Sequence, residues 1–267
     1  MSAALSRLVV GAVLLPVVLG FVWLGGWWLA GLAVVAALVA LHELYVMARS
    51  LRPLVLAGYA GAVLALVGAQ AGGLAWLLSG AMATLLLAFL LYGVAGTRQS
   101  ATVAMGTTVL GVVWIAVGLG HLLLVRDLPD HGRLAVFAIL LAIFGDDTAA
   151  YFVGRLVGRH KLAPSLSPGK TWEGFVAGTV AAVAVAFFAL YSDKDTFLSI
   201  WEIVVLGLVV AFAGASGDLF ESALKRDLGV KDSGQLLAGH GGMLDRVDSI
   251  LFAGVASYYL LLAYGYG

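Results

Sequence analysis

The sequence predicts an all-α, polytopic integral membrane protein with about nine transmembrane helices and a cytoplasmic N-terminus. Of the 267 residues, 62% are hydrophobic and only 11% are charged, which is more apolar surface than a soluble chain of this length can bury. The apolar residues form stretches of about 16–22 residues, the length that an α-helix needs to cross about 30 Å of hydrocarbon. Lys and Arg gather in alternate loops, as they do on the cytoplasmic side of membrane proteins.

The apolar stretches can be laid out as consecutive spans. The first one superficially resembles a signal peptide, but it has no small-x-small cleavage site and a second apolar stretch follows almost at once, so we expect a membrane span. Only a glycine-rich turn separates the third span from the fourth. The predicted spans are 6–24, 27–47, 54–70, 74–92, 103–124, 134–153, 173–191, 203–219 and 249–265.

The distribution of basic residues supports this layout. Twelve of the 15 Lys and Arg residues fall on one side, and only Arg126, Arg133 and Lys194 fall on the other. Because cytoplasmic loops are enriched in Lys and Arg, we expect a cytoplasmic N-terminus and an external C-terminus. A miscounted span would scramble this asymmetry.

Ionisable residues divide the chain into two predicted regions. Residues 1–125 contain few of them and are expected to be transmembrane scaffold helices, whereas residues 126–267 form a catalytic region with cytoplasmic loops 154–172 and 220–248. The 15 basic and 15 acidic residues balance, which gives no reason to expect a nucleic-acid partner. The chain has no cysteine, so thiolate catalysis, disulfides and Cys-ligated metals are excluded.

Carboxylates near the cytoplasmic ends of three predicted spans are the main candidates for chemistry, because ionisable groups inside a membrane are costly. They are Asp146, Asp147, Asp218, Asp245 and Asp248. Asp218, Ser222 and Lys225 follow one stripe of a helix, and carboxylates beside a lysine suit Mg²⁺ bound together with phosphates. The structural alternative is a set of interhelical ion pairs among Asp218, Lys225, Arg226, Asp245 and Arg246.

Two glycine-containing loops could bind phosphate. The segment 166–174, LSPGKTWEG, contains GKT but is no P-loop, since Pro164 stands where that motif needs glycine. We expect a helix that begins near Ser167 and presents Lys170 and Thr171 to an anion; the alternative is a capped helix with a snorkelling lysine.

The second loop is GHGG at 239–242, where His240, Gly241 and Gly242 could contact a triphosphate. A glycine-rich turn at a helix start is the alternative. Further upstream, His42 and Glu43 are expected to form a pair at the membrane interface.

The segment 222–248, SALKRDLGVKDSGQLLAGHGGMLDRVD, closely resembles the signature of the phosphatidate cytidylyltransferases, or CDP-diacylglycerol synthases. Ala238 departs from the family's usual Pro or Gly. The segment 147–174 resembles another stretch that the family shares, whereas the N-terminal half is similar only in being hydrophobic and multi-spanning.

This resemblance implies a nucleotidyltransferase of phospholipid biosynthesis in the cytoplasmic membrane, which makes CDP-diacylglycerol and pyrophosphate from phosphatidic acid and CTP at the cytoplasmic face. Membrane lipids are its surroundings, Mg²⁺ is the expected cofactor, and a second cation and a homodimer are left open. The implied catalytic residues are Asp218, Lys225, Arg226, Asp245 and Asp248, and the implied metal ligands are Asp218, Asp245, Asp147 and Asp248. The implied substrate-binding residues are Lys170, Thr171, Ser222, Lys231, His240, Gly241, Gly242 and Arg246.

A transporter or channel with intramembrane acidic residues is the competing hypothesis. Such a protein would usually line a route through the whole bilayer, whereas these ionisable residues crowd one face.

Overall fold

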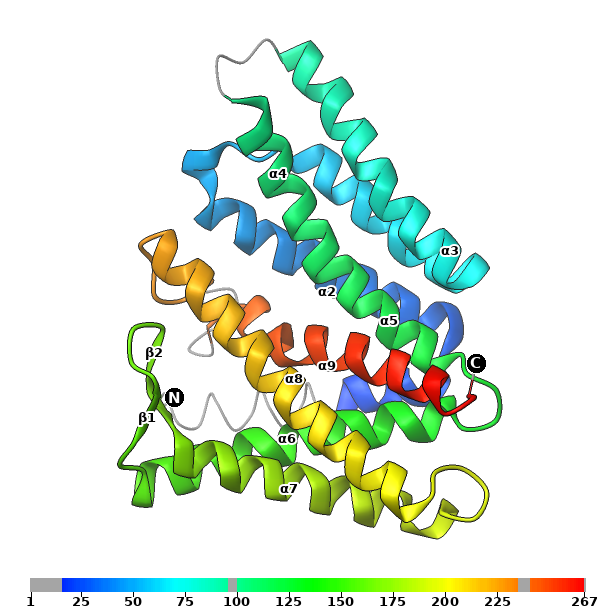
Figure 1. The fold of residues 1–267 in the computed structure, drawn as a ribbon. Coiled ribbons are helices and arrows are strands. Elements are labelled where there is room, and N and C mark those ends of the chain that lie inside the picture. The colour runs from blue at the N-terminus through cyan, green and yellow to red at the C-terminus, as the bar shows by residue number, and fades with distance from the viewer. Residues whose placement is uncertain (1–15, 96–99, 235–240, 267) are drawn as a thin grey trace. The chain divides into compact units, whose positions relative to one another are not determined.

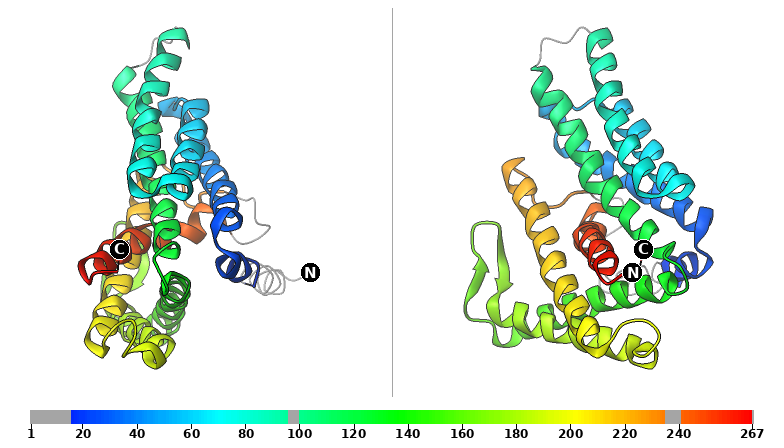
Figure 2. Two further views of the ribbon diagram at one scale, coloured as in Figure 1. Left: turned by 90° about the vertical axis from the view of Figure 1, so that its right-hand side faces the viewer. Right: turned by 45° about the vertical axis from the view of Figure 1, so that its right-hand side comes forward.

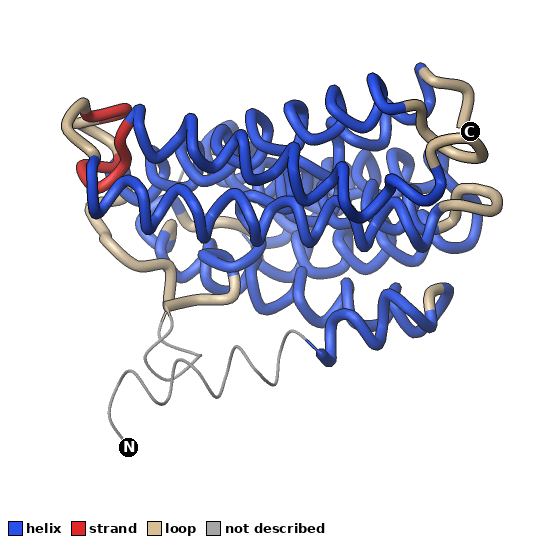
Figure 3. The backbone as a smooth tube through the Cα atoms, turned by 90° about the horizontal axis from the view of Figure 1, so that it is seen from below, coloured by secondary structure: helices blue, strands red, loops and turns tan. Residues whose placement is uncertain are grey.

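The computed structural model describes residues 16–95, 100–234 and 241–266 of the chain. The predicted all-α class is confirmed: the described part is almost entirely helical, with two short strands (Figures 1 and 3). In chain order the elements are α2 (Gly26–Met47), η1 (Arg49–Leu51), α3 (Val55–Ala95), α4 (Ala101–Gly111), η2 (Val112–Ala116), α5 (Val117–Arg126), α6 (Gly132–Val157), β1 (Lys161–Ala163), β2 (Ser167–Thr171), α7 (Trp172–Leu190), η3 (Tyr191–Asp193), α8 (Ile200–Asp227) and α9 (Leu244–Ala263).

Seven helices in the described ranges are long and apolar enough to cross a membrane. Helices suit this role because all their backbone hydrogen bonds are made internally, where lipid offers no partner. Residues 16–24 are also helical, but most of the first predicted span lies outside the described residues. The count of nine spans and the cytoplasmic N-terminus therefore stay predictions.

The longest of these helices, α3, is a hairpin of two helices, as the glycine-rich turn predicted. Its backbone breaks at Gly72 and Gly73, and Gly73 has a positive φ of 71°. A Cβ at Gly68 would lie 2.7 Å from the carbonyl oxygen of Trp76, so the two halves touch backbone to backbone. Figure 2 shows these halves side by side.

The chain forms two compact units: residues 1–124 with 227–247, and residues 125–226 with 248–267. In the first unit, the end of α2 is fixed against α4. Tyr45 donates a hydrogen bond of 2.9 Å to the carbonyl oxygen of Thr108, whose hydroxyl accepts one of 2.8 Å from the backbone N–H of Leu54. Gly111 allows this approach, because a Cβ there would lie 2.9 Å from Leu41 and 3.0 Å from Tyr45.

In the second unit, glycines bring the helix backbones together, as expected for close packing in a membrane. A Cβ at Gly174 would lie 2.7 Å from the carbonyl oxygen of Ala150, where α7 meets α6. A Cβ at Gly207 of α8 would lie 2.6 Å from Cα of Val183 in α7. Gly217 of α8 lies against the backbone of Asp248 in α9. Asp218, which follows Gly217 on α8, is thereby brought to the level of Asp248 on α9.

The predicted helix start at Ser167 is wrong. Ser167–Thr171 is the strand β2, which pairs antiparallel with β1, and α7 begins only at Trp172. Thr171 is the N-cap: its backbone is extended, and its hydroxyl accepts a hydrogen bond of 3.1 Å from the N–H of Gly174. Pro168, which also suits a first helical turn, is tolerated because β2 has a partner on one side only.

The contact between α6 and α7 at Gly178 should be intolerant of larger residues. A Cβ there would meet Oδ1 of Asp146 and would lie 2.9 Å from its backbone oxygen. We expect Gly178→Val to cost about 1–3 kcal/mol and to lower the thermal midpoint in detergent by about 5 °C. Gly31→Val is the control, since nothing lies within 4 Å of a Cβ at Gly31. Equal midpoints for the two variants would contradict this packing.

Candidate active site

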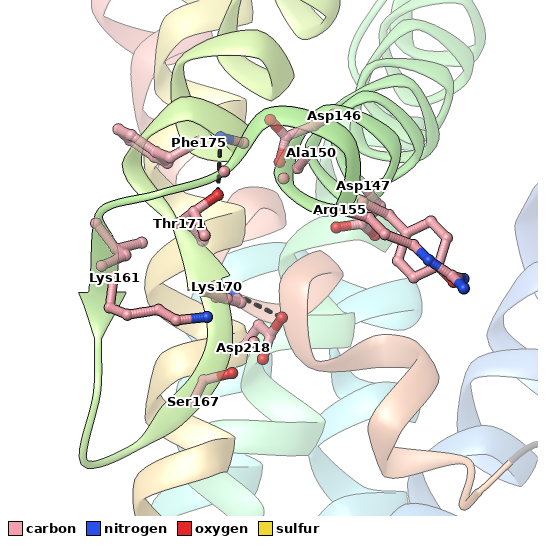
Figure 4. A pocket seen from close by; sticks show the side chains of 17 residues that line it. Asp146, Asp147, Ala150, Arg155, Lys161, Ser167, Lys170, Thr171, Phe175 and Asp218 are labelled. Carbon is pink, nitrogen blue, oxygen red and sulfur yellow. Dashed lines mark hydrogen bonds and ion pairs between the residues drawn. The ribbon is translucent and has the colours of Figure 1, made fainter.

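A cavity of about 720 Å³ lies in the second unit, between α6, the β1–β2 hairpin, α7 and α8 (Figure 4). It combines three acidic and three basic side chains with hydroxyl groups and a few apolar residues. The polar residues that line it are Asp146, Asp147, Tyr151, Arg155, Lys161, Ser167, Lys170, Thr171 and Asp218. A cavity with both charges can hold a phosphorylated ligand and a cation.

The closest charged contact in this cavity joins β2 to α8. Nζ of Lys170 lies 2.6 Å from Oδ2 of Asp218, and each side chain is about one-third exposed or less, at 26% and 32%. Ser222, one turn further along α8, donates a hydrogen bond of 3.4 Å to Oδ1 of Asp218. Asp218 therefore pairs with a residue that lies 48 positions away in the sequence.

The β1–β2 hairpin gives the cavity its lysines. Figure 4 shows Lys161 of β1 and Lys170 of β2 reaching toward Asp218. At the base of the hairpin, Glu173 accepts a hydrogen bond of 3.1 Å from the backbone N–H of Arg159 and one of 2.6 Å from Nδ1 of His160. At its tip, Nε of Arg226 donates a hydrogen bond of 3.2 Å to the carbonyl oxygen of Leu166. Both ends of the hairpin are thus held.

The acidic residues of the second unit differ in exposure. Asp147 is exposed, whereas Asp146 and Asp248 are each 8% exposed. Oδ1 of Asp146 is buried without a hydrogen-bond partner, and Oδ1 of Asp248 accepts a bond of 2.7 Å from the N–H of Ser249. A buried carboxylate oxygen without a partner is unusual, and it is suited to a cation or to a donor from a ligand.

These donors fit Mg²⁺, which prefers oxygen ligands and often takes one or two carboxylates together with substrate phosphates. Within the described residues, no three His, Cys, Asp or Glu side chains are grouped closely enough to hold a metal by themselves. The cavity thus offers carboxylate oxygens, and a phosphorylated substrate would supply the remaining ligands.

Other predicted residues of α8 have structural contacts. Lys225 forms an ion pair of 2.9 Å with Glu221, which is only 1% exposed. Arg226 is exposed and binds the hairpin through its Nε. Neither residue lines the cavity described above, and their predicted contacts with substrate phosphates stay predictions.

The signature residues 231–246 belong to the first unit. Oδ2 of Asp245 accepts a hydrogen bond of 2.7 Å from the N–H of Gly242 and one of 3.4 Å from the N–H of Ser233. Gly241 has a positive φ of 76°, which favours glycine. Lys231 and Arg246 are exposed, and the predicted substrate contact of His240 lies outside the described residues.

Five of the residues that the sequence singled out as candidates line the cavity together: Asp146, Asp147, Lys170, Thr171 and Asp218. Arg155 and Lys161 line it too, although the sequence did not single them out, and so does Ser167, which was expected only to begin a helix. The available signal was their position in loop 154–172, which joins the sixth predicted span to the seventh and contains four Lys and Arg residues.

The chain matches the family model described as "Cytidylyltransferase family" over residues 5–264. The phosphatidate cytidylyltransferase of Haemophilus influenzae is 41% identical over 128 residues, 47% of this chain and 44% of that protein. The enzyme of the same name from Bacillus subtilis is 39% identical over 158 residues, 59% of this chain and 58% of that protein. The one from Mycobacterium tuberculosis is 38% identical over 163 residues, 59% and 47%. The chain spans about half the length of the curated relatives it matches.

Proposed function

Because this chain belongs to the cytidylyltransferase family, we propose that it transfers a cytidylyl group from CTP to phosphatidic acid. A phosphate oxygen of the lipid attacks the α-phosphorus of CTP. The bond from this phosphorus to the bridging oxygen of the β-phosphate breaks, and pyrophosphate leaves with that electron pair. The product, CDP-diacylglycerol, stays in the membrane.

The observation that carries the proposal is the cavity in which the Lys170–Asp218 pair meets the lysine of β1 and the carboxylates of α6. Two polyanions have to be brought together, so catalysis depends on neutralising charge and aligning the reacting atoms. No strong general base is required, because the attacking phosphate is already ionised.

In this mechanism the chain's own residues bind and orient the phosphates. Lys161 and Lys170 extend from the β1–β2 hairpin, which hydrogen bonds fix at its base and tip, and they would contact the triphosphate. Asp218, with Asp147 or Asp248 beside it, would bind Mg²⁺ together with phosphate oxygens of the substrate, and the bound ion would neutralise phosphate charge. The predicted ligand Asp245 belongs to the other unit and is tested separately below. The acyl chains would remain among the lipid-facing helices.

The chain is an integral membrane protein, and we propose that it lies in the cell membrane with this cavity facing the cytoplasm, where CTP is available. The predicted excess of Lys and Arg on that side supports the orientation. A transporter is less well supported, because the family match concerns cytidylyl transfer and a phosphate-binding cavity needs no route through the bilayer.

Pyrophosphate release tests this function directly. The purified protein in mixed micelles should release pyrophosphate only when phosphatidic acid, CTP and Mg²⁺ are all present, and EDTA should stop the release until Mg²⁺ is restored. ATP, GTP and UTP are compared with CTP, and diacylglycerol replaces phosphatidic acid as the control lipid.

Formation of CDP and a phosphorylated lipid from diacylglycerol would instead identify a CTP-dependent lipid kinase. If the protein is folded but none of the four nucleotides supports pyrophosphate release, the proposal is contradicted, and transport assays would then follow.

A further inference from the structure

Glu43, near the end of α2, is buried in the first unit and is only 3% exposed. The expectation that it pairs with His42 at the membrane interface is wrong: His42 is exposed and bonds the hydroxyl of Tyr59 at 2.9 Å. Glu43 instead contacts Ser233 and Met243, in the described parts 231–234 and 241–243 of the loop that precedes α9, here called the signature loop. A buried carboxylate is retained only where other groups satisfy its oxygens.

Both carboxylate oxygens of Glu43 accept hydrogen bonds from residues about 190 to 201 positions away. Oε1 accepts from the N–H of Met243 at 2.9 Å, and Oε2 accepts from the N–H of Leu244 at 2.9 Å. The hydroxyl of Ser233 donates to Oε2 at 3.4 Å. Leu244 is the first residue of α9, so Glu43 binds N–H groups that have no partner within the helix.

Two signature glycines make room for this carboxylate. A Cβ at Gly234 would lie 2.8 Å from Oε1 of Glu43, and a Cβ at Gly242 would meet Oε2 and lie 2.7 Å from Cδ. Neither glycine has a positive φ, so the requirement is for space. These two glycines are therefore needed to leave space for the carboxylate of Glu43, whether or not they also contact phosphate.

The same loop is held a second time by Asp245, which accepts from Ser233 and Gly242. The carboxylates of Glu43 and Asp245 therefore share the loop residues 233 and 242 and bracket the start of α9. Because the Tyr45–Thr108 hydrogen bond fixes the end of α2, Glu43 is presented from a rigid support.

We propose that Glu43 is a positioning residue: it anchors the signature loop to α2 and thereby orients Asp245 and the loop backbone for cytidylyl transfer. The catalytic part of this role rests on the proposed function, whereas the anchoring does not. Glu43 itself touches neither substrate nor metal in this role.

Glu43→Gln tests the anchor with little change in volume. An amide has one acceptor oxygen, so one of the two backbone N–H groups would face an NH₂ group. We expect the backbone amides of Met243 and Leu244 to exchange hydrogen at least about tenfold faster than in the wild type, because one hydrogen bond that protects them is lost. We also expect kcat to fall at least about tenfold, because misplaced groups slow chemistry, with the KM for CTP within about threefold.

The matched control is His42→Gln, one residue away on the same helix, which should leave exchange in 233–244 and kcat unchanged. Activities are normalised to folded protein, so a loss of stability alone does not lower kcat. Glu43→Asp keeps the charge but shortens the side chain, and it should show an intermediate kcat; it also serves if Glu43→Gln does not fold.

Unchanged exchange in the loop would overturn the anchor. Faster exchange with a normal kcat would overturn the positioning role. If the wild-type protein releases no pyrophosphate, the proposed function fails, while the exchange measurement still decides whether Glu43 anchors the loop.

Discussion

Asp245→Asn should abolish turnover, a fall of more than about 100-fold, while the detergent-solubilised protein stays folded. The asparagine oxygen can still accept from the N–H groups of Gly242 and Ser233, which Asp245 binds at 2.7 and 3.4 Å. The hydrogen bonds to the loop are therefore kept, while the negative charge with which Asp245 is predicted to bind Mg²⁺ is lost. Pyrophosphate release and the thermal midpoint are measured on the same preparation.

Asp195→Asn is the control for this substitution, because Asp195 is 83% exposed in a pair with Lys194. Asp195→Asn should change neither the rate of pyrophosphate release nor the thermal midpoint. Wild-type turnover by Asp245→Asn would remove Asp245 from the predicted metal ligands. A large fall in the thermal midpoint would instead assign it a mainly structural role.

Lys170→Met should lower kcat/KM for CTP about 100-fold, the loss typical of removing one charged donor from a developing anion. The substitution keeps the length of the side chain but removes the cation that lies 2.6 Å from Asp218 in the cavity. It also leaves the Asp218 carboxylate without this partner. Lys170→Arg should recover part of the activity, since the charge returns with a different geometry.

Lys194→Met is the matched control for Lys170→Met. Lys194 pairs at 3.1 Å with the exposed Asp195, and exposed pairs contribute little. Both variants are assayed with saturating phosphatidic acid and varied CTP. Equal kcat/KM values for the wild type and Lys170→Met would rule out Lys170 as a phosphate ligand.

The membrane fold follows from local properties of the sequence, which is why it could be predicted. Long apolar stretches become helices in lipid because no other open structure satisfies the backbone. The turn between the halves of α3 was visible as glycine, since a positive φ of 71° at Gly73 is costly for other residues. The acidic residues at helix ends were visible because charge is rare in such stretches.

The strand at 167–171 could not be predicted in this way. Ser167 and Pro168 suit a helix start, and the pairing with Lys161 and Ala163 that makes them a strand is absent from the local pattern. The lysine of this segment was nevertheless recognised as a phosphate candidate, because its charge and position do not depend on whether the backbone is helical or extended.

The amino-acid sequence by itself determined the membrane class and the residue types available for phosphate chemistry, because these depend on composition and spacing. Only the tertiary structure decided which groups meet. Lys170 pairs with Asp218, and Glu43 binds the start of α9 from the far end of the sequence. Such contacts depend on helix packing, which glycines permit by letting backbones approach, and no local pattern records which helix lies opposite.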